Sequence, residues 1–205
     1  MNTRPKASLA QRKRQLVTEE LMEAALQLLA RRGFDAVTID EIAAAAGASK
    51  RTFFRYFASK EDVVVQFLSG MGEQMSAELA GRPAGERPSV AMRHTVQVPL
   101  AACADRSDHA ERALRVVQLI LRTPSLRARF LEHQAQWRDA LAEQLAPRLA
   151  PGPDTELRAR LAAGVVLTAF DTVLGQWSDS DGTADMTALV DRVFTVLAPA
   201  LDGGR

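Results

Sequence analysis

Apolar side chains recur every three or four residues along most of the chain, and no stretch alternates apolar and polar residues as a β-strand does. Glycine or proline separates many of these segments, as expected of loops between helices. The pattern therefore predicts an all-α protein. Its helices are expected at about 16–32, 38–46, 49–58, 59–80, 89–104, 108–122, 125–149, 154–177 and 185–197.

The segment 38–60 has the most complete local signals in the chain. Thr38 is followed three residues later by Glu41, which is the spacing of a capping box at a helix start. Gly47 supplies a left-handed residue that ends this first helix, and Ser49 is a good N-cap for the next. Two short helices joined by a three-residue turn are typical of a DNA-reading helix-turn-helix.

The second helix of this pair has two chemically different sides. Phe53 and Phe57 fall on one side, whereas Arg51 and Arg55 fall on the opposite side. Arginine and lysine side chains can pair with guanine O6 and N7 in the major groove. A helix that is anchored by two phenylalanines and is basic elsewhere is therefore suited to insertion in that groove.

These residues belong to a longer stretch that resembles a known family. The region 16–68, which contains the run LLARRGFDAVTIDEIAAAAGASKRTFFRYFASKEDV, looks like the N-terminal domain of the tetracycline-repressor (TetR) family of bacterial transcription regulators. Together with the positions on the helix, the resemblance implies that Lys50, Arg51 and Arg55 contact base edges, with Thr52 and Phe54 beside them. It also implies that Thr38, Tyr56 and Lys60 contact phosphates. The predicted DNA-binding residues are Thr38, Ser49, Lys50, Arg51, Thr52, Phe54, Arg55, Tyr56 and Lys60.

One of these positions departs from the family pattern. Phe54 stands where family members often have tyrosine, so a hydroxyl contact to DNA from that position is missing.

Charge is distributed unevenly although the net charge is only +1. Residues 1–60 hold 11 Lys or Arg against 6 Asp or Glu, and residues 61–205 hold 15 against 19. A basic end on an acidic body favours contact with nucleic acid through that end. We therefore expect a DNA-binding domain at 1–58 and a second domain at 59–205. The first 11 residues, with the basic cluster at 12–14, are interpreted either as a mobile arm that reaches DNA or as a solvated tail.

The body is rich in aliphatic residues, and its run ALRVVQLILRTPSLRARFLEHQAQWRDALAEQLAPRL is similar to the acyl-CoA-like and mycofactocin-regulator subgroup of the same family. That resemblance implies a small hydrophobic effector, such as an acyl-CoA or fatty acid. The same residues would equally fill a dry core. The predicted effector-binding residues are Met92, Val96, Leu100, Val117, Leu121, Trp137, Leu141, Val165 and Phe170. An anionic end of the effector would need one or two of Arg93, Arg115, Arg122 or Arg138, although each of these is individually more typical of a solvated arginine.

In the family, the last two long helices pair with their copies in a second subunit. The apolar surface of 154–177 agrees with this homodimer, although it could also be intrachain core. A dimer would place two reading heads about 34–36 Å apart, over an inverted-repeat operator in double-stranded DNA. The alternative function is a DNA-binding dimer that needs no effector and responds to a protein partner.

The sequence offers little support for an enzyme. The three histidines are scattered, and neither a His-Glu metal motif, a nucleophile elbow, a Walker loop nor a dinucleotide fingerprint is present. We expect no metal and no cofactor. A catalytic helical protein is the third class considered. The single cysteine, the lack of a long apolar run and the absence of a signal peptide predict a cytoplasmic protein without a membrane partner.

Overall fold

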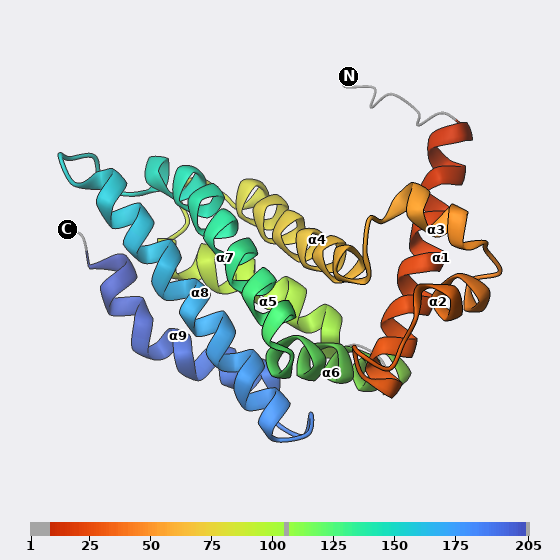
Figure 1. Cartoon of the computed structure of the whole chain (residues 1–205). Helices are drawn as coiled ribbons and strands as arrows, with labels where there is room; N and C mark the ends of the chain where they lie inside the picture. Colours follow the sequence, from red (N-terminus) through yellow and green to blue (C-terminus); the bar gives the residue numbers. More distant parts are fainter. Residues whose placement is uncertain (1–8, 105–106, 204–205) are drawn as a thin grey trace. The chain divides into compact units, whose positions relative to one another are not determined.

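The computed structural model describes residues 9–104 and 107–203, in which helices joined by turns and loops are the regular secondary structure and no strand occurs (Figure 1). The prediction of an all-α protein is therefore confirmed. The helices within the described residues are α1 (Leu9–Arg32), α2 (Ile39–Ala45), α3 (Lys50–Tyr56), α4 (Lys60–Gly81), α5 (Pro88–Ala104), α6 (Ser107–Arg122), α7 (Pro124–Leu145), the 3₁₀ turn η1 (Ala146–Arg148), α8 (Thr155–Asp179) and α9 (Met186–Asp202).

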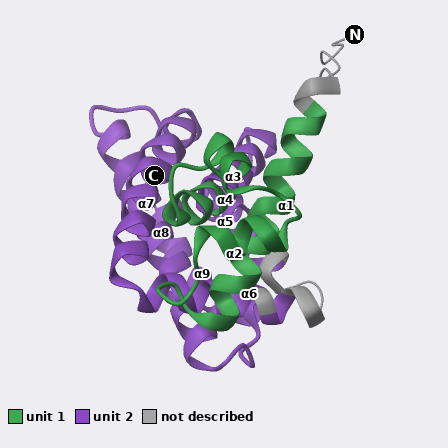
Figure 2. Ribbon diagram, turned by 45° about the vertical axis from the view of Figure 1, so that its right-hand side comes forward, with its two compact units in different colours: residues 1–67 green, residues 68–205 purple. Residues whose placement is uncertain are grey.

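The chain divides into two compact units between Phe67 and Leu68 (Figure 2). The division falls inside α4, whereas the sequence placed the boundary just before this helix. One continuous helix therefore begins in the first unit and ends in the second.

In the first unit α1 packs against α2, and α2 packs against α3. Leu21, Ala25 and Leu29 are fully buried along one side of α1, at the spacing that the sequence predicted. Gly33, in the left-handed conformation with φ 83°, ends the helix. The helix begins at Leu9 rather than Leu16, so the basic cluster at 12–14 lies within α1 and was wrongly assigned to an arm. The predicted arm at residues 1–8 lies outside the described residues.

The predicted caps of the helix-turn-helix are confirmed. The Thr38 hydroxyl accepts a hydrogen bond from the Glu41 N–H at 3.3 Å, and the Glu41 carboxylate accepts one from the Thr38 N–H at 2.8 Å. Gly47 has φ 61°, and the Ser49 hydroxyl accepts from the Thr52 N–H at 3.1 Å. Local sequence thus fixes where α2 ends and α3 begins.

The second unit is a bundle in which α8 packs against α7 and α9, and α5 packs along α9. Helix α8 is buried on several sides, as its apolar sequence predicted, but one stripe of it remains exposed. Helix α9 continues past Pro199 to Asp202, whereas the sequence predicted an end at Leu197. The Asp202 carboxylate accepts hydrogen bonds from the Ser89 N–H at 2.9 Å and hydroxyl at 2.6 Å, which holds this last turn against α5.

Among residues 9–104 and 107–203, no helix is both long enough and apolar enough to cross a membrane.

Candidate DNA-binding surface and effector core

Helix α3 is held in the first unit by its aromatic side. Phe53 is fully buried and Phe57 is 3% exposed, with their ring centroids 5.4 Å apart. On the other side, Arg51 and Arg55 are exposed. Among the described residues, Arg51 has no hydrogen-bond or ion-pair partner. The helix therefore presents cationic side chains to solvent from a rigid base, as DNA reading requires.

Lys50, the first residue of α3, does have a partner. Its ammonium lies 2.8 Å from the Asp40 carboxylate on α2, and both side chains are more than half exposed. Asp40 gives no signal of this contact in the sequence, because an acidic residue in the first turn of a helix is ordinarily explained by the helix dipole. The contact joins residues ten positions apart and appears only once the turn is folded.

The remaining predicted residues of α3 and its caps surround this basic side. The Arg55 guanidinium lies 5.0 Å from the centre of the Tyr56 ring and 3.4 Å from its hydroxyl. The Thr52 and Ser49 hydroxyls are 2.9 Å apart. Phe54 is 48% exposed and meets Phe53 edge to face. An exposed aromatic ring next to arginines can contact a thymine methyl group.

At the start of α2, Thr38 is exposed but its polar atoms are engaged in the capping box. The Glu41 carboxylate also lies 2.6 Å from the Arg32 guanidinium at the end of α1. The backbone hydrogen bond from Thr38, followed by the one from Arg32, lowers the pKa of Glu41 to about 2. Glu41 is thus ionised at neutral pH and joins α1 to α2.

Lys60, at the first position of α4, is engaged inside the unit. Its ammonium donates to the Phe34 carbonyl at 2.8 Å and to the Val37 carbonyl at 2.7 Å. It also lies 4.6 Å from the centre of the Phe34 ring. An ammonium has three N–H donors, so one is left for a phosphate. Lys60 therefore has a structural role that the sequence did not indicate.

In the second unit, Trp137 on α7 is the centre of an aromatic cluster. Its ring meets those of Phe130 and Phe170 edge to face, with centroids 6.1 and 6.2 Å away. Its indole edge also touches the backbone of α4 at Gly72, where a β-carbon would lie 2.1 Å from the indole nitrogen. Only glycine fits this contact, so Trp137 directly abuts the helix that continues into the DNA-binding unit.

The predicted effector residues are mostly interior. Besides Trp137, eight residues were predicted to bind the effector, and Leu121 among them is half-buried. Six of the eight are at most 4% exposed, namely Met92, Val96, Leu100, Val117, Leu141 and Phe170. Val165 is 42% exposed on the outer side of α8, so the structure does not place it with the rest. Leu100 also lines a pocket of about 190 Å³ beside Trp177 and Met186.

The arginines of the body are largely engaged by acids or carbonyls. Of the four suggested for an anionic effector, Arg93 pairs with Asp191 at 2.5 Å, and Arg115 and Arg138 have acidic neighbours on their own helices. Within the part of the chain that the structure describes, Arg122 is the one without such a partner.

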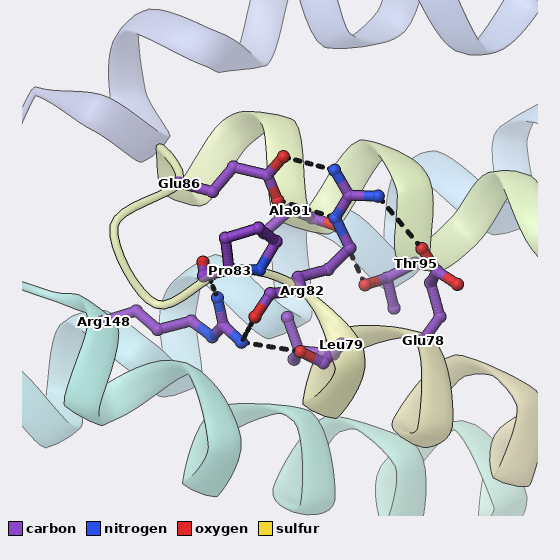
Figure 3. A network of polar contacts seen from close by, with 8 residues as sticks. All are labelled: Glu78, Leu79, Arg82, Pro83, Glu86, Ala91, Thr95 and Arg148. Atoms are coloured by element: carbon purple, nitrogen blue, oxygen red, sulfur yellow. Dashed lines mark hydrogen bonds and ion pairs between the residues drawn. The ribbon is translucent and has the colours of Figure 1, made fainter.

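Arg148, in η1, closes the end of α4 (Figure 3). Its guanidinium donates to the carbonyls of Leu79, Arg82 and Pro83 at 2.7–2.8 Å. Arg82 is itself paired with Glu86, whose carboxylate raises the Arg82 pKa. The carboxyl end of α4 is therefore tied to the end of α7 by charge-assisted hydrogen bonds.

An exposed apolar surface, which we call the outer face, runs along α8 and α9. Leu157, Leu161 and Val165 follow each other at four-residue spacing on α8 with 57%, 59% and 42% exposure, and Val196 on α9 is 76% exposed. Leu161, Val165 and Ala200 line one groove of about 500 Å³. Exposed apolar surface of this kind is typical of interaction sites in general.

Within the described residues, no group of three or more His, Cys, Asp or Glu side chains is placed so that it could hold a metal ion.

A helix-turn-helix unit with an exposed basic helix, continuous through α4 with an all-helical body, defines a DNA-binding transcription regulator. Sequence comparison agrees with this class. The family of bacterial regulatory proteins called tetR matches residues 21–67, and the MftR C-terminal domain matches residues 86–202. The chain belongs to the TetR family of transcription regulators.

Relatives from several bacteria match most of this chain. The HTH-type transcriptional regulator TcmR of Streptomyces glaucescens is 33% identical over 82% of this chain and 76% of its own. MftR of Mycobacterium tuberculosis, named as a transcriptional regulator of mycofactocin biosynthesis, is 29% identical over 97% of this chain and 98% of its own length. The structure of Thermus thermophilus FadR, a TetR-family repressor in complex with lauroyl-CoA, matches with TM-score 0.54 and 26% identity over 88% and 92%.

Proposed function

We propose that the protein is a repressor that binds an inverted-repeat operator as a dimer and is released by a small hydrophobic effector such as an acyl-CoA. DNA binding is supported mainly by the structure of α3, in which the buried Phe53 anchors the helix while Arg51 and Arg55 are exposed. In this proposal Lys50, Arg51 and Arg55 reach base edges, while Thr38, Tyr56 and Lys60 lie towards phosphates.

The outer face supports dimerisation. Four large apolar side chains with 42–76% exposure on two adjacent helices would be covered by the same surface of a second copy. Leu161→Glu should therefore convert a dimer into a monomer in analytical ultracentrifugation and abolish high-affinity operator binding. Leu131→Glu is the matched control, because Leu131 is similarly exposed, at 49%, but belongs to α7 and not to the α8 and α9 residues that define the outer face. Equal sedimentation of both variants would contradict the outer face as the interface.

The body supports an acyl effector by its composition and its relatives. The aromatic cluster around Trp137 lies in a buried core rich in aliphatic side chains, an environment whose composition suits an acyl chain. The T. thermophilus FadR structure holds lauroyl-CoA. An acyl chain placed beside Trp137 would displace its ring against Gly72 and so shift α4.

Linkage then gives the mechanism. The effector binds better when α4 is in one position, and operator DNA binds better when α4 is in another. Each ligand therefore weakens the binding of the other by the same factor. The Arg148 contacts hold the carboxyl end of α4, which leaves its amino end, joined to α3, to move.

The experiment is fluorescence anisotropy of the purified protein on a labelled duplex that it selects from a random-sequence pool. Lauroyl-CoA is then titrated into the complex, with free coenzyme A as the control that lacks the acyl chain. Release by lauroyl-CoA alone supports both halves of the proposal. Selective binding that ignores both compounds would favour the effector-independent regulator, and the absence of selective binding would refute DNA reading by α3.

A further inference from the structure

We propose that Asp40 is a specificity residue of the DNA-binding surface: by holding the Lys50 ammonium, its carboxylate weakens binding to DNA in general more than binding to the operator. This inference rests on the proposed function, since it takes α3 as the helix that meets the major groove.

The geometry of the pair is fixed by the two helix starts. Asp40 lies in the first turn of α2, between Thr38 and Glu41 of the capping box, and Lys50 is the first residue of α3 after its Ser49 cap. The Lys50 Nζ is 2.8 Å from Asp40 Oδ2, with 56% and 63% of the side chains exposed. The carboxylate therefore lies on the same accessible side as the cation that is expected to meet DNA.

Lys50 differs in this respect from its neighbours on α3. Among the described residues, Arg51 has no partner at all and Arg55 contacts only the Tyr56 side chain. One of the three cations on the basic side is thus neutralised before DNA arrives, while the other two are not.

Binding to arbitrary DNA depends almost entirely on phosphate contacts. A phosphate that approaches Lys50 must either replace Asp40 or share the ammonium with its carboxylate, and the repulsion between these two anions is unfavourable for every sequence. At the operator, an ammonium with three N–H donors can keep Asp40 while donating to guanine O6 or N7. The unfavourable contribution therefore falls mainly on incorrect sites, which is how a repulsive element improves specificity.

The test compares Asp40→Asn with Asp35→Asn on two duplexes, the selected operator and a scrambled duplex of the same length and composition. Asp35 is the matched control, because it is exposed in the same unit, it has no partner among the described residues and its substitution removes the same charge. Asp40→Asn should tighten the scrambled complex about fivefold, the equivalent of roughly 1 kcal/mol between two unit charges 4 Å apart in water. The operator complex should tighten by less than about twofold, since Lys50 keeps its base contact.

Lys50→Ala, made alone and together with Asp40→Asn, shows whether Asp40 acts through the lysine. If it does, the gain of Asp40→Asn on scrambled DNA disappears in the Lys50→Ala background, because the restrained group is gone. A gain that persists there overturns the proposal, as does an equal effect of Asp35→Asn and Asp40→Asn on scrambled DNA. Weaker binding of both duplexes by Asp40→Asn would also overturn it.

Failure of the proposed function is separately visible. If the wild-type protein prefers no duplex from the pool, operator reading fails. Binding of Asp40→Asn to scrambled DNA, with and without Lys50→Ala, still decides whether Asp40 restrains Lys50.

Discussion

In the DNA-binding unit, the Arg51 guanidinium has no partner among the described residues, whereas in the body the Arg93 guanidinium lies 2.5 Å from the Asp191 carboxylate. Arg148 donates instead to three carbonyls at the end of α4. In the first unit Arg51 and Arg55 have no acidic partner among the described residues, whereas most cations in the body are engaged by acids or carbonyls. Availability for a polyanion therefore depends on pairing in three dimensions, which a count of charges does not reveal.

The two units differ in the same way in how they place aromatic residues. In the first, Phe53 and Phe57 anchor a surface helix, so the functional side is the side that they leave free. In the body, Trp137 lies inside and touches α4 directly. Changes in the body should accordingly alter stability and coupling, while changes on α3 should alter affinity alone.

Among the substitutions that test this difference between the units, Gly72→Ala should have the largest effect. The new methyl group would overlap the Trp137 indole, so we expect a loss of about 3 kcal/mol in the free energy of unfolding, the upper part of the range for overpacking. Urea unfolding followed by circular dichroism measures it.

Gly70→Ala is the control on the same helix, because a β-carbon there meets none of the described atoms within 4 Å. It should stabilise the protein by up to ~1 kcal/mol through helix propensity. Similar effects of the two substitutions would mean that Trp137 does not constrain α4.

Arg51→Ala tests the other unit. We expect operator affinity to fall by about 1 to 3 kcal/mol with relaxed sequence preference, and unfolding to be unchanged, because the side chain is exposed. Anisotropy on operator and scrambled duplexes reports the first and urea unfolding the second.

Arg31→Ala removes the same charge from the exposed end of α1 and should leave sequence preference intact. If Arg51→Ala weakens binding equally on all DNA, Arg51 is a backbone contact rather than a base reader.

How well the sequence predicts each unit depends on how far apart along the chain the interacting residues lie. The caps at Thr38 and Ser49 and the stop at Gly47 act over three or four residues, so the sequence located α2 and α3 correctly. The Asp40 contact to Lys50 spans the turn and was missed. Lys60 was interpreted as a phosphate ligand alone, because its carbonyl partners lie more than twenty residues earlier in the chain.

In the body, apolar periodicity located the helices but did not distinguish interior from outer face. Val165 and Phe170 both fit the apolar pattern of α8, yet Val165 is 42% exposed and Phe170 1%. Which side of a nearly all-apolar helix faces inward depends on its neighbours. The role of Gly72 was only half visible, since a helical glycine indicates close packing without naming the partner.

Lys60→Ala sharpens the comparison, because this residue combines both kinds of use. Loss of the hydrogen bonds to the Phe34 and Val37 carbonyls should lower the free energy of unfolding by about 1 to 2 kcal/mol. If the third N–H meets a phosphate, the dependence of log affinity on log salt should flatten by about one unit. A stability loss with an unchanged salt slope would make Lys60 purely structural.

The smallest expected effect concerns pH and Glu41. Its pKa of about 2 in the folded protein lies below the ordinary value of 4.5, so its ionised form stabilises the fold above about pH 4.5. This contribution is lost as pH falls towards 2. Glu41→Gln keeps an acceptor for the Thr38 N–H but lacks the charge that meets Arg32. The difference in urea midpoint between wild type and Glu41→Gln should therefore shrink from pH 6 towards pH 2.5, and a constant difference would show that the Glu41 charge does not join α1 to α2.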